Sequence, residues 1–362
     1  SKDFRPSLSF HFDEVFDIVA NEVKNIQNNV GLTEVNGFNR FEISGPDANG
    51  FVERIFCGNI TQKSGRVSLG YLLNDLGMIK SEATISNIPA SDRGPKRMWY
   101  GSAAASEFHD MDWLEQNINT DEDVEIRSLT NDQTILLIAG PKAREVLSKC
   151  SREDWSKEAF PWLSIRECFI GFSAATVMSV SFSGELAYEV HVPNESLYAA
   201  YLTLFKAGEE FGMKLFGSRA VESMRMEKGF LAWKSDLLTE FDPYETGLER
   251  FVNLSKDNFI GKKALQKRIN NGLNQKLVCL QVACKHAPAY GGASLMEDGK
   301  VVGTITSGDW GHRVNLNLAY AFVNPEKSKE GTQMHLDLLG EVVEVEVIPF
   351  GPYDKTYSRI LA

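Results

Sequence analysis

Two glutamates lie four positions apart in residues 183–189, whose sequence is SGELAYE. Apolar and polar residues alternate over 176–182, and the Ser183-Gly184 pair then predicts a β-hairpin that returns over 186–190. On the returning strand Glu185 and Glu189 share one face, while the apolar side chains share the face toward the core. Four strand residues span roughly 13 Å. At most one of the two glutamates can therefore bind a given small group.

One carboxylate on a rigid strand suits a planar heterocycle that offers a ring N–H next to an exocyclic NH2, such as the amino-oxo edge of a pterin. The carboxylate accepts two parallel hydrogen bonds from such an edge, and the pleat of the strand fixes the direction of the side chain. Two solvated acids on a strand surface are the alternative, and charged residues are mostly exposed. The motif alone leaves both interpretations open.

The composition is that of an ordinary globular protein with two or three domains, at 362 residues, 43% hydrophobic and 24% charged. The net charge is -11 and no run of Lys or Arg forms a basic stripe. This argues against nucleic acid or an anionic membrane as partner. No apolar run reaches 18 residues and the first residues do not form a signal peptide. We expect a cytoplasmic protein, or one of the mitochondrial matrix if the source is eukaryotic.

The five cysteines are scattered, with no CxxC pair and no histidine at ligand spacing. This pattern predicts a reducing compartment and no metal site. No Cys-His or Ser-His dyad is recognisable among the dispersed histidines. The glycine-rich motifs of the usual nucleotide-binding folds do not occur either.

An internal repeat joins residues 43–48 (ISGPDA) with residues 138–143 (IAGPKA). Each copy follows a strand-like run and precedes an amphipathic helix, in which we expect the proline at the first helical position. Two copies of one strand-turn-helix unit predict a duplicated α+β module. A chance match of two Gly-Pro helix starts is the alternative.

Apolar periodicity predicts further helices over 12–26, 106–118, 195–211 and 218–229. After about residue 275 the pattern changes to short strands and turns, which predicts a small all-β domain. The expected strands are 277–282, 299–302, 319–323, 334–339 and 342–348.

Seven collinear motifs resemble those of the aminomethyltransferase (glycine-cleavage T-protein) superfamily. They are Gly45-Pro46, residues 77–82 (GMIKSE), residues 183–189, residues 224–227 (MRME), residues 242–245 (DPYE), residues 259–262 (FIGK) and residues 306–308 (TSG). The resemblance is closest to the tetrahydrofolate-dependent C-terminal portion of dimethylglycine and sarcosine dehydrogenases, to which Phe4-Arg5-Pro6-Ser7 is also similar. The flavin-binding half of those enzymes is not expected in this chain.

The resemblance implies an α+β fold, a cloverleaf of two related ferredoxin-like α+β modules and a C-terminal small distorted β-barrel, with tetrahydrofolate in a central opening. We expect the three domains at 1–140, 141–274 and 275–362, with the boundary of the first approximate because the modules can interleave. The repeat and the β-rich tail agree with this expectation.

The resemblance also implies roles for two acids and an aromatic residue. Glu189 matches the acid that grips the pterin, and Phe182 stands where the family commonly has a tyrosine. Glu82 stands where the T-protein branch has an aspartate that serves the chemistry near the folate N5–N10 bridge. An unperturbed glutamate titrates near ~4.3, so Glu82 would act as base or counter-charge. A solvent-facing charge on a strand is the alternative for Glu82.

Three further candidates follow from the same resemblance. Arg225 matches an arginine that approaches the ligand, and its alternative partner is Glu222 on the same helix. Tyr71 lies two residues after the position of the family's pterin-side tyrosine. Trp310 would close the opening from the β-domain, or would serve as a core residue.

The predicted function is a tetrahydrofolate-dependent aminomethyl or methyl transferase, in which N5 attacks a methylene iminium or an activated methyl donor. The donor would derive from a methylated amine, a betaine or a sulfonium compound, with a separate flavin oxidase or carrier protein as partner. The alternatives are a folate-binding accessory protein without transfer activity, and the folate half of a flavin-dependent demethylating dehydrogenase.

Overall fold

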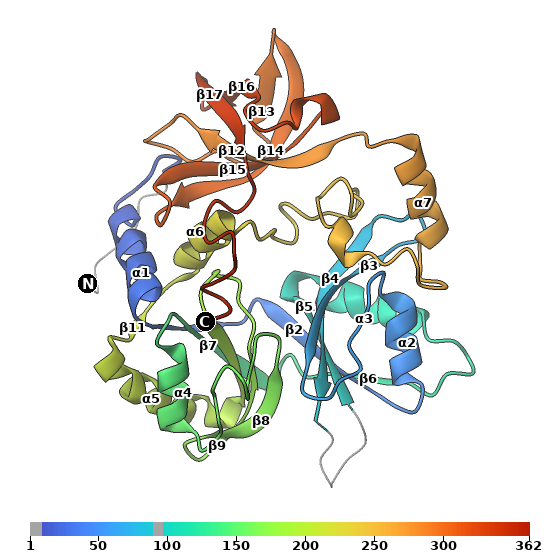
Figure 1. The fold of residues 1–362 in the computed structure, drawn as a ribbon, viewed down its shortest axis with the longest axis vertical. Coiled ribbons are helices and arrows are strands. Elements are labelled where there is room, and N and C mark those ends of the chain that lie inside the picture. Colours follow the sequence, from blue (N-terminus) through green and yellow to red (C-terminus); the bar gives the residue numbers. More distant parts are fainter. Residues whose placement is uncertain (1–8, 90–96) are drawn as a thin grey trace.

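The computed structural model describes residues 9–89 and 97–362, so the Phe4-Arg5-Pro6-Ser7 run lies outside the described residues. Figure 1 shows three lobes, with a β-barrel at the top and two lobes of sheets and helices below it. We call the lower two the first lobe, which holds a five-stranded sheet, and the second lobe, which holds a six-stranded sheet. The predicted α+β fold with a C-terminal barrel is confirmed.

The first lobe packs two helices, α2 (Ala48–Ile55) and α3 (Glu107–Gln116), against one face of its antiparallel sheet. The spatial order of the strands is β3 (Val67–Leu73), β4 (Ile79–Ile88), β5 (Arg97–Ala103), β2 (Phe38–Ser44) and β6 (Glu125–Ser128). Alternate residues of β4, including Ala83 and Ile85, enter this core. Glu82 therefore projects from the opposite face of the sheet.

The second lobe has helices on both faces of its sheet. The spatial order is β11 (Lys214–Leu215), β1 (Gly31–Val35), β7 (Gln133–Ala139), β10 (Ala187–Pro193), β9 (Ser173–Met178) and β8 (Ile165–Ile170). Helices α4 (Ala143–Cys150) and α5 (Leu197–Gly208) cover one face, and α1 (Phe16–Asn28) and α6 (Ser218–Lys228) cover the other. Figure 1 shows α6 between the second lobe and the barrel.

The two sheets interleave along the chain, because β1 pairs with β7 rather than with the strands that directly follow it. Helix α1 likewise belongs to the second lobe. A division into domains at residues 140 and 274 therefore stays a prediction.

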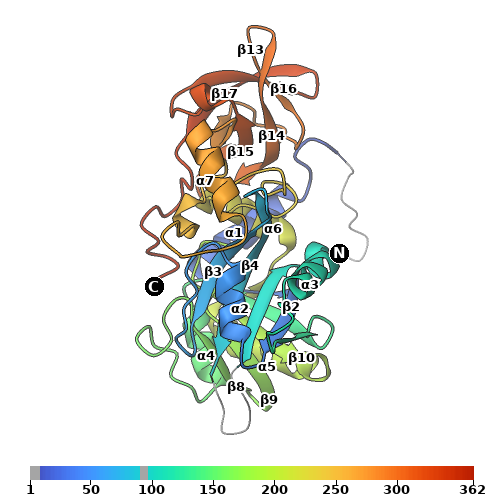
Figure 2. The ribbon, with the colours of Figure 1, turned by 90° about the vertical axis from the view of Figure 1, so that its right-hand side faces the viewer.

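The barrel is closed, with spatial order β12 (Lys276–Val282), β15 (Leu316–Val323), β14 (Lys300–Gly311), β13 (Ser294–Glu297), β16 (Gln333–Leu338) and β17 (Glu341–Ile348). Helix α7 (Lys262–Asn271) precedes it, and Figure 2 shows α7 beside the lower end of the barrel. All five strands that the sequence predicts here are present. The sequence did not predict β13 or the full length of β14.

The internal repeat is present in both lower lobes, where β2 leads to α2 and β7 leads to α4. Gly45 and Gly140 have φ of +111° and +129°, and an added Cβ would lie 2.2 Å and 2.4 Å from backbone oxygens. Only glycine fits such a turn. The helices begin at Ala48 and Ala143, so each proline lies in the preceding turn and not at the first helical position.

Short 3-10 turns occupy Ala104–Ser106, Asn194–Ser196, Glu209–Phe211, Glu249–Phe251 and Pro325–Lys327. Among the described residues, no helix is both long enough and apolar enough to span a bilayer.

Candidate active site

Tyr71 and Glu82 form the first part of the candidate site, on directly opposed positions of β3 and β4. The Tyr71 hydroxyl donates a 3.1 Å hydrogen bond to Oε1 of Glu82. Burial and, to a smaller extent, the charge of Asp236 raise the pKa of Glu82 to about 7, although the Tyr71 hydrogen bond opposes the shift. Glu82 is therefore poised to exchange a proton near neutral pH.

Arg225 lies on α6 with its side chain only 1% exposed, and it forms both an intrahelical ion pair and a tertiary one. Its Nε donates to Glu222 over 3.1 Å, which is the alternative that the sequence left open. Its Nη1 also donates to Oδ2 of Asp236 over 2.6 Å. Arg225 therefore acts on the Glu82 region through Asp236.

Asp236 is fully buried in the irregular segment after α6 and joins elements from three parts of the chain. Its Oδ1 accepts hydrogen bonds from the hydroxyls of Thr306 and Ser307 on β14. Its Oδ2 accepts from the backbone N–H of Ala232 at 2.9 Å, in addition to Arg225. Sequence reasoning missed Asp236, because no periodic pattern marks a residue in an irregular loop.

Glu189 lies on β10 with 17% of its side chain exposed, and Nε2 of His191 lies 3.1 Å from its Oε2. Residue Met178 is directly opposite Glu189 on β9, and Ser86 of β4 donates a 3.0 Å hydrogen bond to the Met178 sulfur. Opposed residues of an antiparallel pair share a face, so Glu189 projects toward the face of β4 that carries Glu82 and Ser86.

This arrangement brings the two acids to one region without letting them touch. Ser86 is four residues from Glu82 along β4, which corresponds to roughly 13 Å. One acid can therefore accept hydrogen bonds from the end of an elongated ligand, while the other faces a more distant atom of the same ligand.

Strands β9 and β10 form the predicted antiparallel hairpin, but the turn is longer than the Ser183-Gly184 pair, and Glu185 does not share an exposed face with Glu189. Strand β9 ends at Met178, and residues 179–186 form a loop before β10. Glu185 is 1% exposed and accepts hydrogen bonds at 2.7 Å from Arg313, Arg359 and Tyr353. It is a structural anchor for the C-terminal segment, because three distant donors require a buried acceptor there.

The remaining two candidates contact other aromatic residues. Phe182 stacks on Phe230 with ring centroids 6.0 Å apart and an interplanar angle of 11°. Trp310 packs edge-on against Phe12 and Phe16, at 5.9 Å and 5.8 Å. Phe230 also accepts a hydrogen bond at its carbonyl from Arg225, which places the Phe182 pair beside the Arg225 cluster.

A second carboxyl with a raised pKa lies on β14 near Arg225. Burial raises the pKa of Asp309 to about 7, and the charge of Glu222 adds to the shift. Arg225 thus lies near Glu222, Asp236 and Asp309, and Asp236 in turn lies near Glu82, while Arg219 is a second cation near Asp309. Carboxyl groups outnumber guanidinium groups in this cluster, which favours a cationic ligand over an anionic one.

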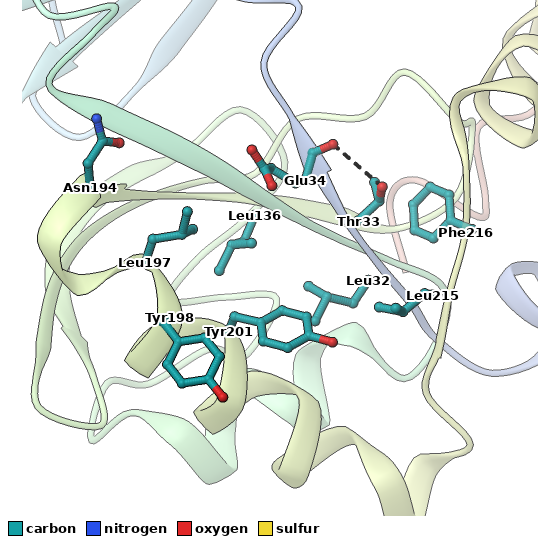
Figure 3. Close-up of a pocket in the computed structure, with 10 residues that line it drawn as sticks. All are labelled: Leu32, Thr33, Glu34, Leu136, Asn194, Leu197, Tyr198, Tyr201, Leu215 and Phe216. Carbon is teal, nitrogen blue, oxygen red and sulfur yellow. Dashed lines mark hydrogen bonds between the residues drawn. The ribbon is translucent and has the colours of Figure 1, made fainter. Parts of the chain in front are cut away.

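A cavity of about 470 Å³ lies elsewhere, on the outer side of the second lobe between α5 and the edge of its sheet. Figure 3 shows its apolar lining, with Tyr198 and Tyr201 on the helix and Leu32 and Leu215 on the strands. Its lining includes neither Glu82 nor Glu189. We place the candidate site at the acids on the inner faces of the two sheets, because the pKa of Glu82 is raised there and several buried polar partners converge on Asp236.

The described part of the chain holds no group of three or more His, Cys, Asp or Glu residues placed to bind a metal ion. All five cysteines are free. Burial raises the pKa of Cys57, Cys168 and Cys279 to about 12 and that of Cys150 to about 11, so these four are poor nucleophiles at neutral pH.

Comparison with known proteins gives two family matches. The GCVT N-terminal domain model matches residues 2–256, and the glycine cleavage T-protein C-terminal barrel domain model matches residues 275–354.

Individual relatives agree with these matches. The chain is 34% identical over 340 residues to human dimethylglycine dehydrogenase, covering 93% of this chain but 38% of that protein. It is 25% identical over 345 residues to an aminomethyltransferase of Thermoanaerobacter pseudethanolicus, covering 95% of this chain and 92% of that protein. The crystal structure of aminomethyltransferase T from Bartonella henselae superposes with a TM-score of 0.84 at 20% identity, covering 97% and 94% of the two chains.

Proposed function

The chain belongs to the glycine-cleavage T-protein family, and from this premise we propose that it is a tetrahydrofolate-dependent one-carbon transferase. The single observation that carries the proposal is the placement of Glu189. Its carboxylate is partly exposed, lies 3.1 Å from Nε2 of His191, and projects toward the face of β4 that carries Glu82.

The residues present fit a bound folate. A carboxylate has about four lone-pair sites, so Glu189 keeps acceptors for the amino-oxo edge of a pterin after it pairs with His191. The Phe182 and Phe230 rings offer an apolar stacking surface, and Leu69, on the strand that carries Tyr71, leaves 40% of its surface exposed. Bound tetrahydrofolate would supply N5, the nitrogen that accepts the one-carbon unit.

Glu82 is the proposed base and counter-charge. With a pKa of about 7, it can take the proton lost as the new carbon–nitrogen bond forms, and in its ionised form it stabilises a cationic donor. Tyr71 orients the carboxylate. Arg225 and Asp236 hold the surrounding charges in place.

The proposed donor is a cationic one-carbon unit derived from a methylated amine, a betaine or a sulfonium compound. The cluster of Glu222, Asp236 and Asp309, with Glu82 next to Asp236, supports this class. The chain spans about 40% of the length of the dimethylglycine dehydrogenases it matches. We therefore propose that a flavin-bearing oxidase, as a separate partner or a further part of the same protein, generates the unit by demethylation.

We also propose that the protein works in mitochondria or in another reducing compartment. The dimethylglycine dehydrogenases it resembles are named as mitochondrial, and the free cysteines are compatible with a reducing compartment.

Calorimetry with tetrahydrofolate tests the pterin assignment. Glu189→Gln removes a charge-assisted pair and should weaken binding by about 1.5 to 3 kcal/mol. Glu195→Gln, an exposed acid just beyond β10, is the control and should bind normally. Unchanged affinity of Glu189→Gln, or no binding by the wild type, would overturn the proposal.

A second candidate is the folate half of a flavin-dependent demethylating dehydrogenase, which the 34% identity to human dimethylglycine dehydrogenase favours. Turnover of a methylated amine with tetrahydrofolate only after a flavin dehydrogenase is added would support it over an independent transferase. Folate binding without turnover under any of these conditions would instead indicate an accessory protein.

A further inference from the structure

Several buried polar atoms without a hydrogen-bond partner lie near Glu189, at the contact between the first and second lobes. Buried nitrogens without a hydrogen-bond partner include Nε and Nη1 of Arg40, Nε1 of Trp99 and Nδ1 of His191. The Trp99 and His191 rings are 5.5 Å apart. Arg40 lies close enough to both Glu189 and His191 for its charge to influence them.

The strand registers explain why these residues meet. In the first lobe Trp99 is opposite Ser86, and Arg40 is opposite Gly101, which is in turn opposite Thr84. These positions lie on the Glu82 face of the sheet. His191 follows Glu189 by two residues on β10, so it shares the face of Glu189.

His191 is held in its neutral form. Its side chain is only 2% exposed, and burial lowers its pKa, as does the charge of Arg40, although Glu189 opposes the shift. A neutral imidazole has one N–H donor. Because Nε2 faces Oε2 of Glu189 at 3.1 Å, we assign the proton to Nε2, which leaves Nδ1 as the unpartnered acceptor.

We infer that His191 is a positioning residue that fixes the carboxylate of Glu189 in the orientation in which it accepts hydrogen bonds from the pterin edge. The inference rests on the proposed function, in which Glu189 binds the pterin. A glutamate has three rotatable side-chain bonds, and ordering such a side chain on binding costs affinity. The Nε2–H donor of His191 removes that cost in advance and still leaves the carboxylate with free lone pairs.

In this inference His191 affects folate binding only through Glu189, and this predicts a specific pattern of affinities in single and double variants. Loss of the imidazole donor should weaken folate binding when Glu189 is present. The same loss should have no further effect once Glu189 is replaced. Residues that act as a unit show such non-additivity, whereas independent structural effects add.

The test is a double-mutant cycle on the full chain, read by calorimetry with tetrahydrofolate and by the melting temperature without ligand. His191→Leu should weaken binding about tenfold. His191→Gln, whose amide can replace the Nε2–H donor, should stay within about threefold of the wild type. The double variant Glu189→Gln/His191→Leu should bind no more weakly than Glu189→Gln alone.

Val190→Ala is the matched control, since Val190 is a buried neighbour on the opposite face of β10. It should lower the melting temperature without changing affinity in folded protein. If His191→Leu does not fold, His191→Asn replaces it, because the shorter amide cannot reach Glu189.

The outcomes separate this inference from the proposed function. No effect of Glu189→Gln on binding overturns the proposed function. A normal effect of Glu189→Gln together with unchanged binding by His191→Leu, or with additive losses in the double variant, overturns the role of His191.

Discussion

Tyr71 and Glu82 are joined by a hydrogen bond of 3.1 Å between directly opposed positions of β3 and β4. Each strand is anchored on its other face by the core of the first lobe, so the hydroxyl and the carboxylate hold a fixed relationship. The environment places the pKa of Glu82 at about 7, which makes the carboxylate titratable in the range where an enzyme works.

The rate should depend on the ionisation of Glu82. A general base must be ionised, so turnover should rise with pH through a midpoint near 7. Glu82→Gln should lower turnover by about 10²- to 10⁴-fold and leave tetrahydrofolate affinity nearly intact. Steady-state kinetics and calorimetry check both, with Glu42→Gln on β2 as the control. A fully active Glu82→Gln variant would remove Glu82 from the chemistry.

The same carboxyl should make stability depend on pH. Its pKa is raised in the folded state above its usual value of 4.5, so the folded protein binds more protons than the unfolded chain between these values. The contribution of Glu82 to stability should therefore fall as the pH rises from about 4.5 through about 7, by up to about 3 kcal/mol. Denaturant unfolding at pH 5 and pH 8 should show that Glu82→Gln loses less stability than the wild type over this interval. An equal loss in the two proteins would contradict the raised pKa.

Two neighbours of Glu82 should move its titration in opposite directions. Tyr71→Phe removes the hydrogen bond that favours the ionised form, so the midpoint of the pH–rate profile should move to higher pH. Asp236→Asn removes a charge that opposes ionisation, so the midpoint should move to lower pH. A shift of both variants in the same direction would mean that another group controls the profile.

Glu185 should matter for stability rather than for chemistry. Glu185→Gln removes the buried counter-charge of Arg359 and one of the two that Arg313 has, the other being Glu227, and breaking such a buried ion pair costs about 3 to 5 kcal/mol. Glu167→Gln, which breaks the half-exposed pair with Arg97, should cost less than about 1 kcal/mol. Urea unfolding of the two variants compares them directly. Similar losses would show that the Glu185 cluster is not a buried anchor.

Much of the architecture could be predicted because periodic patterns report burial directly. The repeated strand-turn-helix units and the barrel strands were visible in the sequence for this reason. The expected helix over 12–26 corresponds to α1, although it begins only at Phe16.

The site was less predictable, because its partners are distant in the chain. Period-two alternation placed Glu185 on the same strand face as Glu189, yet Glu185 lies in a buried cluster with Arg313 and Arg359, which are 128 and 174 residues away in the chain. No sequence pattern marked Asp236 as a residue of the candidate site. His191 could have been found, since it follows Glu189 by two residues and shares its face.

Four groups from different parts of the chain donate hydrogen bonds to Asp236. Through this carboxylate, the packing of the lobes against one another influences the pKa of Glu82. The barrel contributes the Thr306 and Ser307 hydroxyls and α6 contributes Arg225, while Asp236 in turn influences a carboxyl of the first lobe. Any loosening of the barrel would leave Asp236 with fewer donors and a more strongly felt negative charge. The way the barrel packs on the two lower lobes should therefore influence how readily Glu82 loses its proton.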